Sequence, residues 1–199
     1  MYRNDRDYLF GGEHLDGYLQ DNTAQLNARV QRLNATEFED EDELINALFE
    51  EYKITAPTLQ EADKKITANE GEVTVWGNGL IDDGPHDVKG IQVKVSIPYI
   101  GKGELFHVQP STRELSGRPE GTVHGGVLVL RYGTVEKDPE KIKELWQSDL
   151  NKIQRHLGWI SSDLSSYNNL LRDKVTAIVK KRKEEAGNNK SLIDSITQG

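Results

Sequence analysis

The sequence contains no cysteine and few aromatic residues, which make up only 7% of the chain. Without cysteine, the chain forms no disulfide, no thiolate zinc site and no cysteine nucleophile, so histidine and carboxylate side chains are the remaining metal ligands. No apolar run approaches the roughly 18 residues that a membrane-spanning helix requires. Arg3, Asp5, Arg6 and Asp7 exclude the apolar core of a secretory signal peptide. We therefore expect a cytoplasmic protein that does not bind membranes.

Positive charge is also in short supply, since the formal net charge of the 199 residues is -8. A polyanion such as DNA repels an acidic protein on average, so nucleic acid is not expected to attract the chain as a whole. The charge is uneven, with an acidic run at Glu37–Glu43 and a basic run at Lys180–Lys183. We interpret the acidic run as the solvated first turn of a helix, and a docking site for a basic partner is the alternative.

Apolar residues at three-four spacing predict amphipathic helices over residues 15–34 and 42–53. Beyond Pro57 the pattern changes to alternation, which is clearest where Ile91, Val93 and Val95 lie between polar residues. The pair Gly125 and Gly126 indicates a tight hairpin turn, because a two-residue turn favours positive φ. These signals predict a central antiparallel β-meander of four to five strands over residues 71–133.

Two more helices are predicted at the C-terminal side, over residues 139–157 and 162–186. Asp138 is the expected N-cap, and Pro139 suits the first helical position. Gly158 is expected to end the first of these helices, so the two would form an antiparallel hairpin of helices. The fold class is therefore α+β, with a single domain over residues 1–187 and a mobile tail or linker over 188–199.

The histidines and carboxylates do not form a recognisable metal or catalytic motif. No two histidines have the i, i+4 spacing of a helical metal site, although His107 and His124 could meet across neighbouring strands. Asp82 or Asp83 with Asp87 and Lys89 superficially resembles the split carboxylate and D-x-K pattern of restriction-type nucleases. All four lie within residues 82–89, across a Gly-Pro loop, where the required strand geometry is improbable. We predict no catalytic residue, no metal and no cofactor.

Two groups of cations are candidate binding residues. The long loop from Gln109 to Glu120 carries hydroxyl groups beside Arg113 and Arg118, which suit a phosphate or the carboxylate of a partner. The basic run Lys180, Lys181, Arg182 and Lys183 suits phosphate contacts. A structural interpretation also holds for this run, since cations are favourable near the C-terminus of a helix.

Three runs of this sequence resemble the N-terminal region of bacterial multidomain proteins of restriction or anti-phage type, which carry a PD-(D/E)xK-like nuclease domain downstream. The runs are VKGIQVKVSIPYIGKGELFHVQPST, RPEGTVHGGVLVLRY and DLSSYNNLLRDKVTAIVKKRK. The resemblance extends from about Phe10 to Gly187. It implies a non-catalytic region that senses a trigger, holds a partner or sets the assembly state of a nuclease. It carries over no catalytic residue, because the nuclease motif of those proteins would lie beyond Gly199.

We therefore predict a regulatory, sensing or assembly module of a bacterial anti-phage defence nuclease, which is not itself an enzyme. Its partner would be a protein or an attached nuclease domain, bound through the loop 109–120 or the last helix. Nucleic acid would contact only that helix. Two alternatives stay open. One is a free-standing metal-dependent enzyme that processes nucleic acids, and the other is a structural unit whose C-terminal helices pair to form a homo-oligomer.

Overall fold

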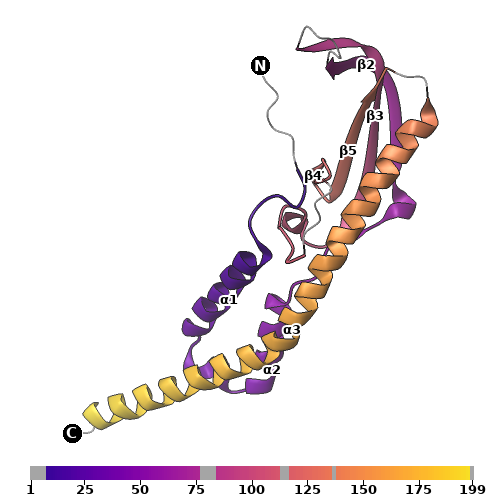
Figure 1. Ribbon diagram of the computed structural model, residues 1–199. Coiled ribbons are helices and arrows are strands. Elements are labelled where there is room, and N and C mark those ends of the chain that lie inside the picture. The colour runs from indigo at the N-terminus through magenta and orange to yellow at the C-terminus, as the bar shows by residue number, and fades with distance from the viewer. Residues whose placement is uncertain (1–7, 77–83, 113–116, 136–137, 198–199) are drawn as a thin grey trace. The chain divides into compact units, whose positions relative to one another are not determined.

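A computed structural model describes residues 8–76, 84–112, 117–135 and 138–197. In this part of the chain the fold is α+β, with three α-helices and an antiparallel sheet of five strands (Figure 1), so the predicted fold class is confirmed. The residues cluster into two compact units. The sheet unit comprises Met1–Glu13 and Ala56–Trp159, and the helical unit comprises His14–Thr55 and Ile160–Gly199.

The sheet is organised around one long central strand. Its strands are β1 (Thr58–Leu59), β2 (Lys65–Trp76), β3 (Pro85–Ile100), β4 (Thr122–His124) and β5 (Val127–Thr134). One side of β3 pairs with β2 and, at its end, with β1, while the other side pairs with β5, which in turn pairs with β4. The order is therefore not that of a simple meander. The neighbour of β3 is β5 rather than β4, because the eight residues of β5 offer more apolar cross-strand pairs than the three residues of β4.

Alternation along β3 gives the sheet one buried face. Val95 and Ile97 are fully buried, and the register places Leu130 of β5 directly opposite Val95. The predicted turn at Gly125 and Gly126 is confirmed, since both have positive φ and join β4 to β5. The predicted sheet began too late in the chain, because β2 starts at Lys65 and β1 at Thr58.

An N-terminal arm and part of the predicted loop also belong to the sheet unit. The backbone N–H of Leu9 donates to the carbonyl of Pro119, and that of Phe10 donates to the carbonyl of Phe106. The ring of Phe10 stacks on His156 at a centroid distance of 4.7 Å. Pro119 is buried at the end of the predicted loop 109–120. The described ends of this loop are therefore partly in the core rather than wholly on the surface.

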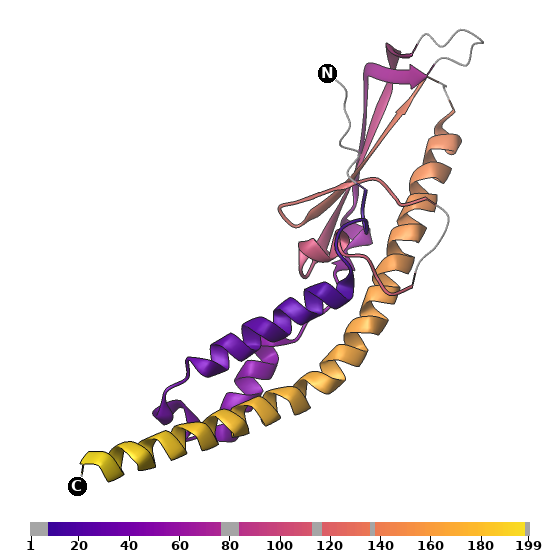
Figure 2. The same cartoon turned by 60° about the vertical axis from the view of Figure 1, so that its left-hand side comes forward.

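The helical unit contains α1 (Leu15–Gln31) and α2 (Glu41–Tyr52), which lie alongside the C-terminal half of α3 (Figure 2). The side chain of Asp40 caps α2 by accepting a hydrogen bond of 2.9 Å from the backbone N–H of Glu43. Asp40–Glu43 of the acidic run thus form the cap and first turn of a helix, which confirms the structural interpretation of this part of the run. The centres of both apolar stripes are buried, with Leu26 and Val30 of α1 and Ile45 and Leu48 of α2.

The last helix, α3, runs without interruption over Pro139–Thr197, so one helix replaces the predicted hairpin of two, and it continues into the predicted tail. Gly158 has a helical conformation and is not among the residues with positive φ. On either side of it, Ile153, Leu157, Ile160 and Leu164 keep a three-four spacing, and all four are buried. Glycine costs a helix only about 1 kcal/mol, which burial of this continuous stripe outweighs. Asp138 caps α3 as predicted, accepting from the backbone N–H of Glu140 at 3.0 Å.

Candidate binding groove

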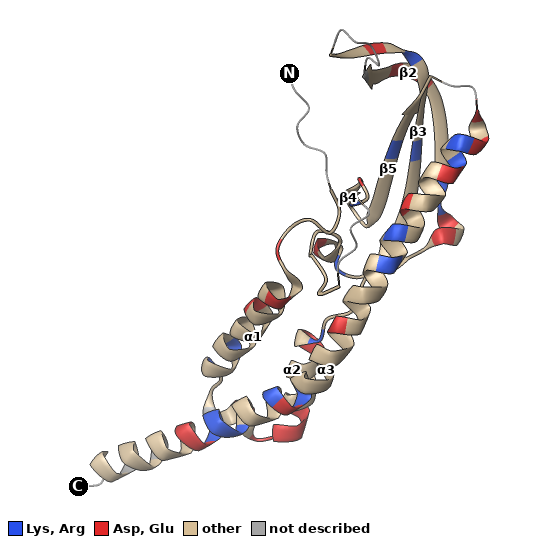
Figure 3. Ribbon diagram, viewed as in Figure 1, with Lys and Arg blue, Asp and Glu red and all other residues tan. Residues whose placement is uncertain are grey.

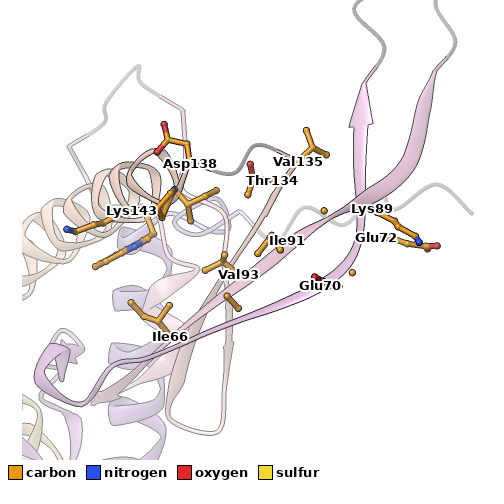
Figure 4. Close-up of a pocket in the computed structure, with 16 residues that line it drawn as sticks. Ile66, Glu70, Glu72, Lys89, Ile91, Val93, Thr134, Val135, Asp138 and Lys143 are labelled. Carbon is orange, nitrogen blue, oxygen red and sulfur yellow. The ribbon is translucent and has the colours of Figure 1, made fainter.

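The sheet unit contains an open groove of about 1040 Å³ between the start of α3 and strands β2 and β3. Figure 4 shows its lining, in which Ile66, Ile91 and Val93 lie on the strands and Lys143 lies on the helix. Most of the surface that faces the groove is apolar, and Ala68, Val135, Ile142 and Trp146 contribute to it as well. The groove therefore offers apolar surface of the sheet unit to another molecule.

The register of the sheet brings the strand residues of the groove to one face. Ile66 lies opposite Val95, Ala68 lies opposite Val93, and Glu70 lies opposite Ile91. Directly opposed residues of antiparallel strands project from the same face, so these six side chains share it. The N-terminal half of α3 covers the part of this face that belongs to β5 and the neighbouring part of β3.

Specific contacts hold α3 on the sheet unit. The hydroxyl of Tyr132 on β5 donates to the carboxylate of Asp149 at 3.1 Å. Burial raises the pKa of Tyr132 well above its usual range, and the negative charge of Asp149 raises it further. The ammonium group of Lys64 lies 5.8 Å from the ring centre of Trp146, and Gln154 donates to Glu61. These contacts fix the helix beside the groove.

The helix leaves the outer part of the sheet face uncovered. Leu130 is fully buried and Val93 is 8% exposed, whereas Ile66 on the outer strand β2 is 48% exposed. Val135, which follows β5 and lines the groove, is 51% exposed. A sheet twists along its width, so a helix that is aligned with β3 and β5 diverges from the edge strand β2. The apolar face thus continues from the core into open groove.

Charged side chains form the rim of the groove. Glu72 on β2 lies opposite Lys89 on β3, and Figure 4 shows the two side chains next to each other. Glu70 lies opposite the apolar Ile91 and has no ion pair or side-chain hydrogen bond within the described residues. The rim therefore carries one carboxylate, Glu70, that forms no ion pair with a described cation of this unit.

The carboxylates and histidines that the sequence singles out do not gather into a metal site. Asp87 accepts a hydrogen bond of 2.6 Å from the hydroxyl of Thr74, and Asp82 and Asp83 lie outside the described residues. His156 is buried, with its Nδ1 2.9 Å from the carbonyl oxygen of Lys152. Over the ranges that the structure describes, no three His, Asp or Glu side chains could hold one cation together.

The predicted binding cations are placed differently from one another. Arg113 lies outside the described residues, while Arg118 is exposed in the sheet unit. In the helical unit, Lys180 and Lys181 are exposed and Lys183 donates to Glu41 at 2.7 Å, so the basic run lies beside the acidic start of α2 (Figure 3). That hydrogen bond and the charge of Lys183 lower the pKa of Glu41.

The remaining cations of the last helix also have contacts inside the protein. Arg182 lies 4.0 Å from Glu185, and its Nε is buried without a hydrogen-bond partner in the described residues. Arg172 lies over the ring of Phe49 at 4.9 Å, and Lys174 lies over the ring of Tyr167 at 5.6 Å. These contacts support the structural interpretation of the basic run, in which Lys180, Lys181 and Lys183 are exposed and Arg182 is partly buried.

The sequence did not reveal the groove. Residues 65–72 alternate too weakly to predict a strand, because both faces of β2 are exposed over most of them. The lining comes from β2, β3, the end of β5 and the start of α3. The one available signal is the pair Ile66 and Ala68, two apolar residues spaced by two in an otherwise polar run.

No family model, curated protein or solved structure matches this chain. Among the described helices, none is both long enough and apolar enough to cross a membrane.

Proposed function

We propose that this protein is an interaction module whose groove binds an apolar segment of a partner polypeptide. The observation that carries the proposal is the apolar sheet face, which passes from the fully buried Leu130 to the half-exposed Ile66, with the half-exposed Val135 lining the groove just beyond the end of β5. Large apolar side chains that remain contiguous and exposed beside a folded core are typical of a surface that a partner covers.

The composition of the groove favours a polypeptide partner. Pockets for small molecules enclose about 300–1,000 Å³ and bury most of their ligand. The groove has about 1040 Å³, at the upper end of this range, and is open to solvent. Its apolar floor and charged rim resemble the apolar centre and polar border of protein interfaces.

The more specific proposal is that the partner belongs to a bacterial anti-phage nuclease, as an attached domain or a separate chain. It rests on the three sequence runs that resemble such proteins. Purified chain incubated with DNA and Mg²⁺ or Mn²⁺ is expected to leave the DNA uncut. Metal-dependent cleavage that disappears in Asp87→Ala would overturn the non-catalytic assignment and favour the enzyme alternative.

Binding to the groove is tested by selecting random peptides, displayed on phage, against the purified chain. The selected peptides are expected to be rich in apolar residues and to lose binding to Ile66→Asp and Val135→Asp. Both positions are half-exposed, so these changes should not disturb folding. The matched control is Ile100→Asp, because Ile100 is an exposed apolar strand residue that does not line the groove. If no peptide is selected, or if all three variants bind equally, the groove is not a binding site.

A second candidate function is self-assembly through the end of α3. Leu192, Ile193 and Ile196 lie within about one turn of one another on this helix, and each is at least 60% exposed. Pairing with a second copy would remove this apolar surface from water. Light scattering should then show a dimer or larger assembly that Ile193→Asp converts to a monomer.

A further inference from the structure

We infer that the partner segment binds as an extended strand that adds to the free edge of β2 and carries a basic residue beside Glu70. The inference rests on the proposed function, since it specifies the conformation and the charge of the segment that the groove accepts.

Strand β2 is an accessible edge. It is 12 residues long, contains no proline, and pairs only with β3 within the described part of the chain. In an antiparallel pair, alternate residues direct their N–H and C=O groups away from the neighbouring strand. Long edge strands are normally shortened, interrupted by proline or covered, since their unpaired groups recruit other strands.

The opposite face of the sheet holds β2 firmly against β3. Val73 is 8% exposed, and its methyl groups lie over two glycines, Gly90 on β3 and Gly133 on β5. A Cβ atom added at Gly90 would lie 2.8 Å from one methyl group of Val73, and one at Gly133 would lie 2.7 Å from the other. Only glycine permits this close approach. The edge of β2 is therefore anchored and ready to pair.

On the groove side, β2 presents Ile66 and Ala68, followed by Glu70 and Glu72. Side chains of an added strand would lie beside these four, at about 4.5–5.5 Å between Cβ atoms. Apolar side chains suit the first two positions. Lys89 already faces Glu72, so Glu70 is the carboxylate that gains most from a lysine or arginine on the incoming strand.

The same charges argue against a second copy of β2 as the occupant. Antiparallel pairing of two copies centred on Gly71, the middle of the strand, would place Glu70 of each copy opposite Glu72 of the other, so that register is disfavoured, and registers shifted away from it pair less of the strand. Like charges directly opposite each other destabilise a strand pair. Charge complementarity therefore favours a different polypeptide, with alternating apolar side chains and one basic residue, in which main-chain hydrogen bonds supply much of the affinity.

The probe is a fluorescein-labelled peptide of about eight residues, an ordinary strand length, in which valine and threonine alternate and one valine is replaced by lysine. A second peptide carries glutamate in place of that lysine. Two further peptides are N-methylated at alternate residues, which removes the N–H donors along one edge of the strand in the first peptide and along the opposite edge in the second. Fluorescence polarisation measures binding to the full chain.

We expect the lysine peptide to bind about tenfold tighter than the glutamate peptide. Glu70→Lys should reverse this preference. The matched control, Glu144→Lys, changes an exposed carboxylate of α3 outside the groove and should preserve it. One N-methylated set should abolish binding while the other retains it, because only one edge of the peptide can pair with β2.

Each failure has a distinct meaning. Equal binding of the two N-methylated peptides, with binding still lost in Ile66→Asp, would overturn strand addition and leave the groove as a binding site. A charge preference unaffected by Glu70→Lys would overturn the role of Glu70. If no alternating peptide binds although phage selection yields groove-dependent peptides, the inference is wrong and the proposed function stands.

Discussion

The two units use the same helix differently. In the helical unit, Leu171, Val175 and Val179 of α3 are fully buried against α1 and α2. In the sheet unit, α3 buries the inner part of a sheet face and leaves Ile66 and Val135 half exposed. Helices that pack on another helix can contact its apolar stripe along its whole length. A helix that packs on a twisted sheet aligns with only some of the strands and leaves the others uncovered. The comparison shows why apolar surface stays open in the sheet unit: a single helix, α3, cannot cover every strand of a twisted sheet.

Polar contacts show the same difference. In the helical unit, Asn22 donates to the carbonyl of Tyr52 at 2.8 Å and to the hydroxyl of Tyr167 at 2.9 Å. Asn168 donates to the carbonyl of Ile54 at 2.7 Å and accepts from its N–H at 3.2 Å. On the rim of the groove, by contrast, Glu70 has no side-chain partner among the described residues.

The largest expected effect is a difference in the free energy of unfolding between substitutions in the covered and the uncovered part of the sheet face. Leu130→Ala should lower the free energy of unfolding by about 2–5 kcal/mol, because it leaves a cavity in a fully buried site. Ile66→Ala should change it by less than about 0.5 kcal/mol, as at other surface positions. Urea titration followed by circular dichroism measures both. Equal losses would mean that Ile66 serves folding, and the distinction between core and groove would fail.

A smaller effect sharpens the account of the helical unit. Asn168→Ala removes both side-chain hydrogen bonds to Ile54, whose side chain is fully buried, and should cost about 1–3 kcal/mol. Its exposed neighbour provides the control, since Asn169→Ala should be close to neutral. If the two variants unfold at the same urea concentration, the Asn168 contacts do not stabilise this unit.

The continuity of α3 is tested at Gly158. Gly158→Ala should stabilise the protein by about 0.5–1 kcal/mol, because alanine loses less backbone entropy in a helix and no atom lies within 4 Å of the added Cβ. Gly126→Ala is the matched control. Its added Cβ also meets nothing within 4 Å, but its φ of 78° should make alanine destabilising. Destabilisation by Gly158→Ala would instead support the hairpin of helices.

The smallest effect concerns the attachment of α3 to the sheet. Because folding raises the pKa of Tyr132, its contribution to stability is present below the unfolded pKa of about 10 and is lost as the pH rises above that value. Tyr132→Phe should therefore reduce the loss of stability between neutral and strongly alkaline pH. At pH 7 the substitution should lower the free energy of unfolding by less than about 1 kcal/mol, because the carboxylate of Asp149 retains its ion pair with Lys152 at 3.2 Å. Parallel alkaline slopes for both proteins would contradict the contact.

The fold could be predicted where one signal dominated a segment. Three-four spacing located α1 and α2, alternation located β3, and Asp138 with Pro139 marked the start of α3. The break at Gly158 was wrong because a local preference of about 1 kcal/mol was weighed above a continuous buried stripe. The start of β2 was missed because a strand exposed on both faces has no alternation to detect.

The candidate site could not be predicted for a different reason. Ile66, Ile91 and Ile142 line one groove only because of strand register and the placement of α3, and no short motif encodes such a combination. The assignment to a defence nuclease, the absence of catalysis and the role of Arg118 remain predictions. The predicted role of Lys183 competes with its ion pair to Glu41.

Each unit is assembled from two distant stretches of the chain, and this has a consequence for biosynthesis. Phe10 packs on His156, and Asn22 bonds to Tyr167, so neither unit is complete until α3 has left the ribosome. Contacts between such distant residues form slowly, and chains that await them expose strand edges and apolar surface. The nascent chain is thus expected to expose these surfaces until residues 139–197 have been synthesised.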